Sequence, residues 1–143
     1  MVTALNIANY ILNRSSEDEG NDTSNLKLQK LLYYCQGFHL AVFDKPLFSE
    51  RIEHWDHGPV VPAVYHEFKA YGSNPLPSPF IFDDSHIASN SKDLIDEVLK
   101  VYDQFSAWKL RDMTHNEPPW QETEDCEEIT GEQLKKYFKT RLK

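Results

Sequence analysis

The sequence predicts a mainly α, α+β fold: a single compact helical domain with about six helices and a small two- or three-stranded antiparallel sheet. Three observations lead to this prediction. The chain has 143 residues and a hydrophobic content of 40%, which suits one core covering residues 1–143 and leaves little for a second. Apolar residues recur at helical spacing, most continuously over residues 26–43. Residues 46–57, in contrast, have neither helical spacing nor clean alternation, and two short strands are expected there.

The chain should open with a short amphipathic helix. Thr3 is a suitable N-cap, and the helix should end near Arg14. Residues 15–25 are polar and acidic around Gly20, and they should form a loop between helices. The apolar positions of the helix are Ala4, Ile7, Ala8 and Ile11.

The second helix, residues 26–43, is apolar on most of its circumference and should be central and mostly buried. It should stop at Asp44-Lys45-Pro46. Lys27, Lys30 and Tyr34 recur at spacings of three and four, so they share a strip, which is expected to be the exposed one. The main apolar stripe consists of Leu28, Leu31, Leu32, Cys35, Phe38 and Val42.

A structural corner should connect the strands to the third helix. Gly58-Pro59 should turn the chain, and Pro62 suits the first turn of a helix, where its missing N–H leaves no acceptor without a donor. Gly72 can end this helix. Trp55 and Tyr65 are expected to pack the corner.

Two further helices should follow a loop at residues 73–91, in which Phe80-Ile81-Phe82 could add a third strand. The first of them begins after Ser91. Ser106 can cap the second, which must finish before Pro118-Pro119, and the two should form a corner.

The last helix has the clearest start signal. Thr130 and Gln133 fit a capping box, and Ile129 is positioned to contact Leu134 across the cap. The apolar face of this helix should consist of Leu134, Tyr137, Phe138 and Leu142.

Charge and hydropathy exclude several classes of protein. Asp and Glu number 23 against 15 Lys and Arg, so the formal charge of -8 disfavours direct binding to nucleic acid. No apolar run approaches the roughly 18 residues that cross a bilayer, and the N-terminus does not resemble a secretory leader, so a cytoplasmic protein with no membrane partner is expected. Cys35 and Cys126 should be reduced and unpaired.

The stretch HWDHGPVVPAVYHEF, residues 54–68, contains three histidines and two carboxylates that could suggest a metal site. On a strand, however, His54 and Asp56 would point to one side and His57 to the other, and no HExxH spacing is present. No metal and no cofactor is therefore expected. We interpret His57 and His66 as polar neighbours of a possible interface.

No nucleophilic site is indicated either, because Cys35 lies on an apolar stripe and no GxSxG motif is present. The chain is therefore not expected to be an enzyme. The segment MTHNEPPW places Thr114 and His115 beside Trp120 at the end of a helix, where their polar groups could brace the corner.

Three motifs together resemble the Panacea domain of SocA-like antitoxins, also called GepA-type phage-associated proteins. They are LKLQKLLYYCQGFHLA at residues 26–41, KPLFSERIEHWDHGPVVPAVYHEFKAYG at 45–72 and LRDMTHNEPPW at 110–120. Cys35 stands where the family usually has a small residue, which favours a packing role. The matching residues are Leu28, Gln29, Lys30, Leu31, Tyr33, Tyr34, Trp55, Gly58, Pro59, Val60, Tyr65, Thr114, His115, Pro119 and Trp120.

The resemblance implies an antitoxin that neutralises a cognate toxin by direct protein–protein binding, the toxin being encoded by an adjacent gene. Three alternatives stay open: an adaptor that delivers the toxin to a protease, a mimic of nucleic acid, and a metal-dependent hydrolase. The hydrolase would use His54, Asp56, His57, His66 and His115. For the toxin-binding surface we expect the strip of Lys27, Lys30 and Tyr34 to lie near Thr114, His115 and Trp120.

Overall fold

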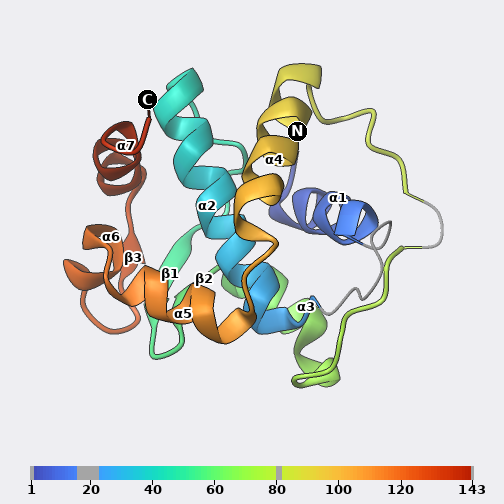
Figure 1. Cartoon of the computed structure of the whole chain (residues 1–143), viewed down its shortest axis with the longest axis horizontal. Coiled ribbons are helices and arrows are strands. Elements are labelled where there is room, and N and C mark those ends of the chain that lie inside the picture. Colours follow the sequence, from blue (N-terminus) through green and yellow to red (C-terminus); the bar gives the residue numbers. More distant parts are fainter. Residues whose placement is uncertain (1, 16–22, 80–81, 143) are drawn as a thin grey trace.

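The computed structural model describes residues 2–15, 23–79 and 82–142 and confirms the mainly helical α+β class (Figure 1). One short helix was not expected: Pro118 and Pro119 open a helix of a single turn, since proline is tolerated in a first turn. The elements are α1 (Ala4–Ser15), α2 (Asn25–Phe43), β1 (Ile52–Trp55), β2 (Gly58–Val60), α3 (Pro62–Phe68), the 3-10 helix η1 (Lys69–Tyr71), α4 (Ser89–Tyr102), α5 (Ala107–His115), α6 (Pro118–Gln121), β3 (Glu128–Ile129) and α7 (Gly131–Lys139).

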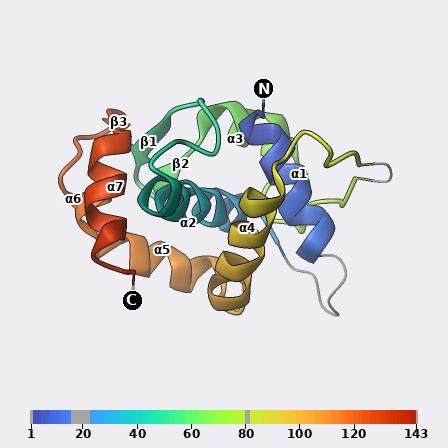
Figure 2. The ribbon, with the colours of Figure 1, turned by 90° about the horizontal axis from the view of Figure 1, so that it is seen from above.

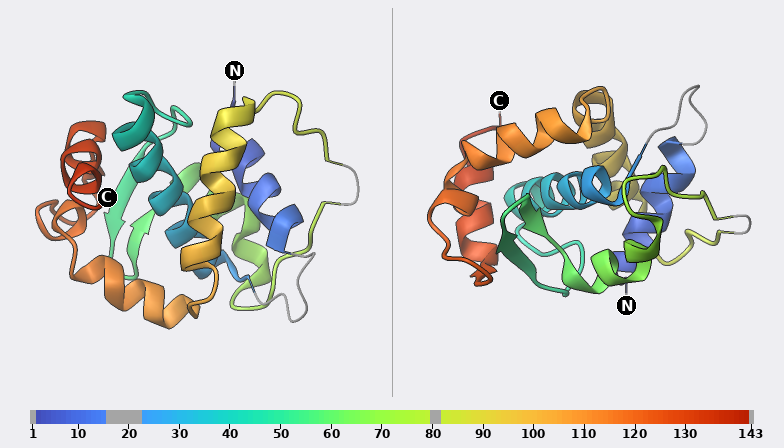
Figure 3. Two further views of the ribbon diagram at one scale, coloured as in Figure 1. Left: turned by 45° about the horizontal axis from the view of Figure 1, so that its top comes forward. Right: turned by 90° about the horizontal axis from the view of Figure 1, so that it is seen from below.

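Helix α2 lies in the middle of the molecule, and α1, α3, α4, α5, α7 and β2 all contact it (Figure 2). Seen from below, it is again enclosed by its neighbours (Figure 3). A helix covered on so many sides cannot keep a polar strip in solvent. The expected exposure of Lys27, Lys30 and Tyr34 is therefore wrong: these residues are 4%, 0% and 0% exposed.

Local signals in the sequence set the helix ends. The hydroxyl of Ser24 accepts the N–H of Lys27 at the start of α2, and that of Thr3 accepts the N–H of Asn6 at the start of α1. Asp44 ends α2 in a left-handed conformation and donates its N–H to the carbonyl of Leu40. Pro62 begins α3 as predicted.

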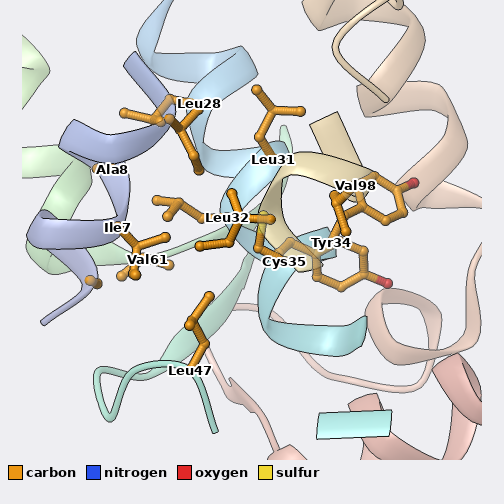
Figure 4. Close-up of a cluster of buried hydrophobic side chains, with 14 of the residues drawn as sticks. Ile7, Ala8, Leu28, Leu31, Leu32, Tyr34, Cys35, Leu47, Val61 and Val98 are labelled. Atoms are coloured by element: carbon orange, nitrogen blue, oxygen red, sulfur yellow. The ribbon is translucent and has the colours of Figure 1, made fainter. Parts of the chain in front are cut away.

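The core is built on α2 (Figure 4). Leu28 and Leu32 face Ile7 of α1, while Tyr34 lies beside Val98 of α4. Cys35 is fully buried, and burial raises the pKa of its thiol well above the ordinary value. Its role is therefore packing, as the family comparison by motif suggested.

The sheet has the order β2-β1-β3, with both pairs antiparallel. Gly58 and Pro59 lie within β2, where Pro59 pairs with His54, so the prediction that they form the turn is wrong. Pro59 is tolerated because β2 is an edge strand, which needs fewer N–H donors. The third strand is Glu128–Ile129; the strand suggested at Phe80-Ile81-Phe82 falls largely outside the described residues.

Helix α7 packs on α2 through Phe138, which is fully buried. The capping box is confirmed: the Thr130 hydroxyl accepts the Gln133 N–H at 3.2 Å, and the Gln133 Oε1 accepts the Thr130 N–H at 2.8 Å. Leu142 lies beyond the helix and is 42% exposed, so its predicted place on the buried face is wrong.

Within the described residues, no helix is both long enough and apolar enough to span a membrane.

Candidate functional site

The three sequence motifs meet at the side chain of Lys30, which α2 places against the β1–β2 hairpin. The Lys30 ammonium donates to the Pro59 carbonyl at 3.2 Å. A Cβ atom added to Gly58 would lie 2.7 Å from Lys30 Cε and 2.9 Å from Thr114 Oγ1, so only glycine allows this approach. The φ of 114° at Gly58 also favours glycine. Lys30, Gly58 and Thr114 therefore form a joint between α2, β2 and α5.

The joint is closed to solvent. Burial lowers the pKa of Lys30 from 10.5 to about 7, and the positive charge of Arg111 acts in the same direction. Thr114 is fully buried, and its hydroxyl donates to the Arg111 carbonyl at 2.9 Å. Neither side chain can contact a partner directly, so the expectation that Lys30 and Thr114 form a toxin-binding surface is wrong.

Gln29 makes a second link between α2 and the chain that follows β2. Its Nε2 donates to Asn25 Oδ1 at 2.9 Å, and its Oε1 accepts the N–H of Val61 at 2.9 Å. This residue is buried, so both halves of the amide are used internally.

Glu117 is a buried carboxylate that was not predicted from the sequence as part of a site. Its carboxylate accepts the hydroxyls of Tyr33 at 2.9 Å and Tyr34 at 2.8 Å. Burial raises the pKa of Glu117, while these hydrogen bonds act against the rise. Its position inside MTHNEPPW, directly before Pro118, was the available signal.

Trp120 is held between two histidines. Its ring stacks on His54 at 4.0 Å and contacts His115 at 3.9 Å, and its Nε1 donates to the Trp55 carbonyl at 3.0 Å. His115 places Nδ1 at 2.7 Å from the Arg111 carbonyl and Nε2 at 2.9 Å from the Asp56 carbonyl. The interpretation of this segment as a brace is confirmed.

The two remaining members of the expected strip lie in different surroundings. Lys27 donates to the Asp103 carbonyl at 2.8 Å and pairs with the Asp103 carboxylate at 3.2 Å. Tyr34 stacks on Tyr102 at 4.0 Å. The strip therefore joins α2 to the α4–α5 region and offers no surface of its own.

The histidines and carboxylates considered for a hydrolase do not assemble. In residues 2–15, 23–79 and 82–142, no group of three His, Cys, Asp or Glu side chains could hold a metal ion. The Nδ1 of His54 lies 2.7 Å from the Trp120 carbonyl, and its Nε2 lies 3.3 Å from Asp125. Both nitrogens of His54 are thus engaged by the fold.

An aromatic surface remains on the hairpin and the adjoining helix α3. We define the hairpin patch as Trp55, His57, Tyr65 and His66. The Trp55 and Tyr65 rings lie 5.0 Å apart, edge to face, as expected for the predicted corner. His66 lies 5.7 Å from Tyr65 and 6.2 Å from Trp55. His57 and His66 are exposed, while the two larger rings are half-buried, so the patch offers both apolar area and polar edges.

Comparison of the sequence with known proteins identifies the family of this chain. The model of the family described as "Antitoxin SocA-like, Panacea domain" matches residues 28–121. The antitoxin SocA of Caulobacter vibrioides (strain NA1000 / CB15N) is 41% identical over 71 residues, which are 50% of this chain and 37% of that protein. The match thus spans little more than a third of the relative's length. No solved structure is significantly similar to this chain.

Proposed function

This chain belongs to the antitoxin SocA-like, Panacea-domain family, and on that premise we propose that it neutralises a protein toxin by binding it directly. The observation that carries the proposal is the match over residues 28–121, together with the curated antitoxin that is 41% identical to this chain over 71 residues. We further propose that the toxin is encoded by an adjacent gene.

The hairpin patch is the surface that we propose for toxin binding. Large aromatic side chains with polar edges are enriched in protein interfaces, and a few of them usually supply most of the binding energy. Trp55 and Tyr65 have this character, and His57 and His66 extend the patch into solvent. His115 and Trp120 hydrogen-bond to the backbone carbonyls of Asp56 and Trp55 and so hold the hairpin that carries the patch in place.

We propose that residues 1–143 act as one SocA-like unit. Helices α1 and α7 lie outside the matched residues 28–121, yet both pack on α2. The packing of Phe138 against Tyr33 at 5.4 Å supports the inclusion of α7.

Co-expression with the product of the neighbouring reading frame tests the function. The chain should restore growth that the toxin alone prevents, and the two purified proteins should form a complex. Trp55→Ala and His66→Ala should each weaken the complex, and a central aromatic should contribute more than about 2 kcal/mol, or roughly 30-fold in Kd.

Trp108→Ala is the matched control, because Trp108 is 63% exposed on α5 and lies outside the patch. It should leave binding unchanged. Melting temperatures of all three variants separate lost contacts from lost folding. A complex that forms normally with both patch variants, while Trp108→Ala disrupts it, would show that the proposed surface is misplaced.

The lifetime of the toxin in cells distinguishes sequestration from delivery to a protease. Under direct neutralisation the toxin should persist in complex with this chain. A toxin that disappears faster when the chain is present would identify the chain as an adaptor.

A further inference from the structure

A groove lies between α6 and α7, on a part of the molecule that the hairpin patch does not use. Its volume is about 510 Å³. Pro118, Pro119 and Tyr137 supply its apolar surface, and the Tyr137 ring is fixed edge to face on Phe138 at 5.0 Å. The other lining residues are Glu122, Thr130, Glu132, Gln133, Lys136 and Thr140.

The net negative charge of the protein arises in the part of the chain that contains α6 and leads to α7. Residues 112–134 contain eight Asp and Glu and no Lys or Arg. Removing these eight from the 23 acidic residues of the chain leaves 15, which equals its 15 Lys and Arg. The formal charge of -8 therefore belongs entirely to this segment.

All of these carboxylates except that of Glu117 are exposed to solvent, and two of them line the groove. Glu122 and Glu132 line the groove, and Glu124, Glu127 and Glu128 are exposed in the segment, including β3, that joins α6 to α7. Among the described residues, these five carboxylates form no salt bridge. Lys136 is the cation that lines the groove. An excess of charge of one sign on a surface raises the local concentration of an oppositely charged partner.

We propose that this groove receives a positively charged amphipathic segment of the protein partner, an inference that rests on the proposed function where the partner is the toxin. An apolar side chain of that segment packs on Pro118, Pro119 and Tyr137, and flanking Lys or Arg side chains pair with Glu122 and Glu132. A second copy of this chain would bring a second charge of -8 and is repelled. Nucleic acid is repelled for the same reason.

The test uses a fluorescent helical peptide of about 14 residues composed of Leu and Lys, with one apolar face. A second peptide carries Glu at every Lys position. The Lys peptide should bind the full chain saturably, and binding should weaken as NaCl is raised from about 50 to about 300 mM. The Glu peptide should not bind.

Two charge changes in the groove should act in opposite directions. Glu122→Lys should weaken binding of the Lys peptide about fivefold, and Lys136→Glu should strengthen it about threefold, because each alters a charge beside the bound segment. The controls Glu67→Lys and Lys109→Glu make the same changes in net charge at exposed positions on α3 and α5. They should alter binding by less than about twofold.

Equal effects in groove and control variants would mean that binding follows net charge alone, and the groove proposal would then be wrong. Absence of saturable binding would also overturn it. The same variants are tested for neutralisation of the cognate toxin. If the unmodified chain neutralises the toxin but binds no peptide in the groove, the groove inference fails alone. If it neutralises no neighbouring gene product, the proposed function fails, and the peptide result still decides whether the groove binds basic segments.

Discussion

Lys30 brings an amine into the centre of the molecule, where one backbone carbonyl is its hydrogen-bond acceptor. The free-energy cost of burying this amine depends on pH. The pKa is about 7 in the folded protein and 10.5 for an ordinary lysine, so the folded state binds fewer protons between these values. The free energy of unfolding should therefore rise with pH above about 7 and fall again as pH is lowered toward that value.

Urea unfolding of the wild-type protein and of Lys30→Met measures this effect. The wild type should gain about 1.5 kcal/mol between about pH 7 and about pH 8.5 relative to the variant, since a full proton is worth 1.36 kcal/mol per pH unit. The variant cancels contributions from other titrating groups. Parallel pH profiles for the two proteins would show that Lys30 keeps its charge when folded.

Glu117 is a buried acid, whereas Lys30 is a buried base. Three tyrosines surround its carboxylate. The hydroxyls of Tyr33 and Tyr34 donate to separate oxygens, and Tyr137 also hydrogen-bonds the group. Burial of an acid raises its pKa and destabilises the charged form, while hydrogen-bond donors stabilise that form. The residue therefore joins α2 to the start of α6 and to α7.

At the scale of elements, α7 depends on a close approach that only glycine permits. A Cβ atom at Gly37 would lie 2.2 Å from the Phe138 ring, which is closer than any real contact. Gly37→Ala should therefore displace α7 and destabilise the protein by at least about 2 kcal/mol, because the ring sits in a packed core. Thermal melting and urea unfolding measure the loss.

Gly131→Ala is the control for this change. A Cβ atom there would meet only the Leu40 side chain at 3.8 Å, an ordinary contact, so stability should stay the same or rise slightly. If Gly37→Ala melts at the wild-type temperature, α7 does not pack on α2 as described.

At the scale of the whole molecule, α2 is the element on which the rest of the fold is assembled. Because five helices and β2 contact it, its amides can open only when those contacts are lost. Hydrogen exchange should therefore be slowest in α2 and much faster in the single turn of α6. Exchange in α2 as rapid as in α6 would contradict a central role for α2.

The sequence by itself determined the longer helices, several of their caps and the family. The hydroxyl of Ser106 accepts the N–H of Lys109, and Thr130 forms a capping box with Gln133, both as predicted. These signals are local, because a cap and its partner lie three residues apart and helical spacing repeats within one segment. The order of the motifs that identified the family is likewise a property of the sequence alone.

Tertiary structure alone decided which polar residues are buried. Lys30 bonds a carbonyl 29 residues away, and Tyr34 donates to a carboxylate 83 residues away. The sequence of a helix does not show whether its polar side chains hydrogen-bond to water or to a distant segment of the chain. The strip on α2 was therefore predicted to lie on the surface. The groove between α6 and α7 was equally hidden, because it exists only after α7 has packed on α2 and against α6.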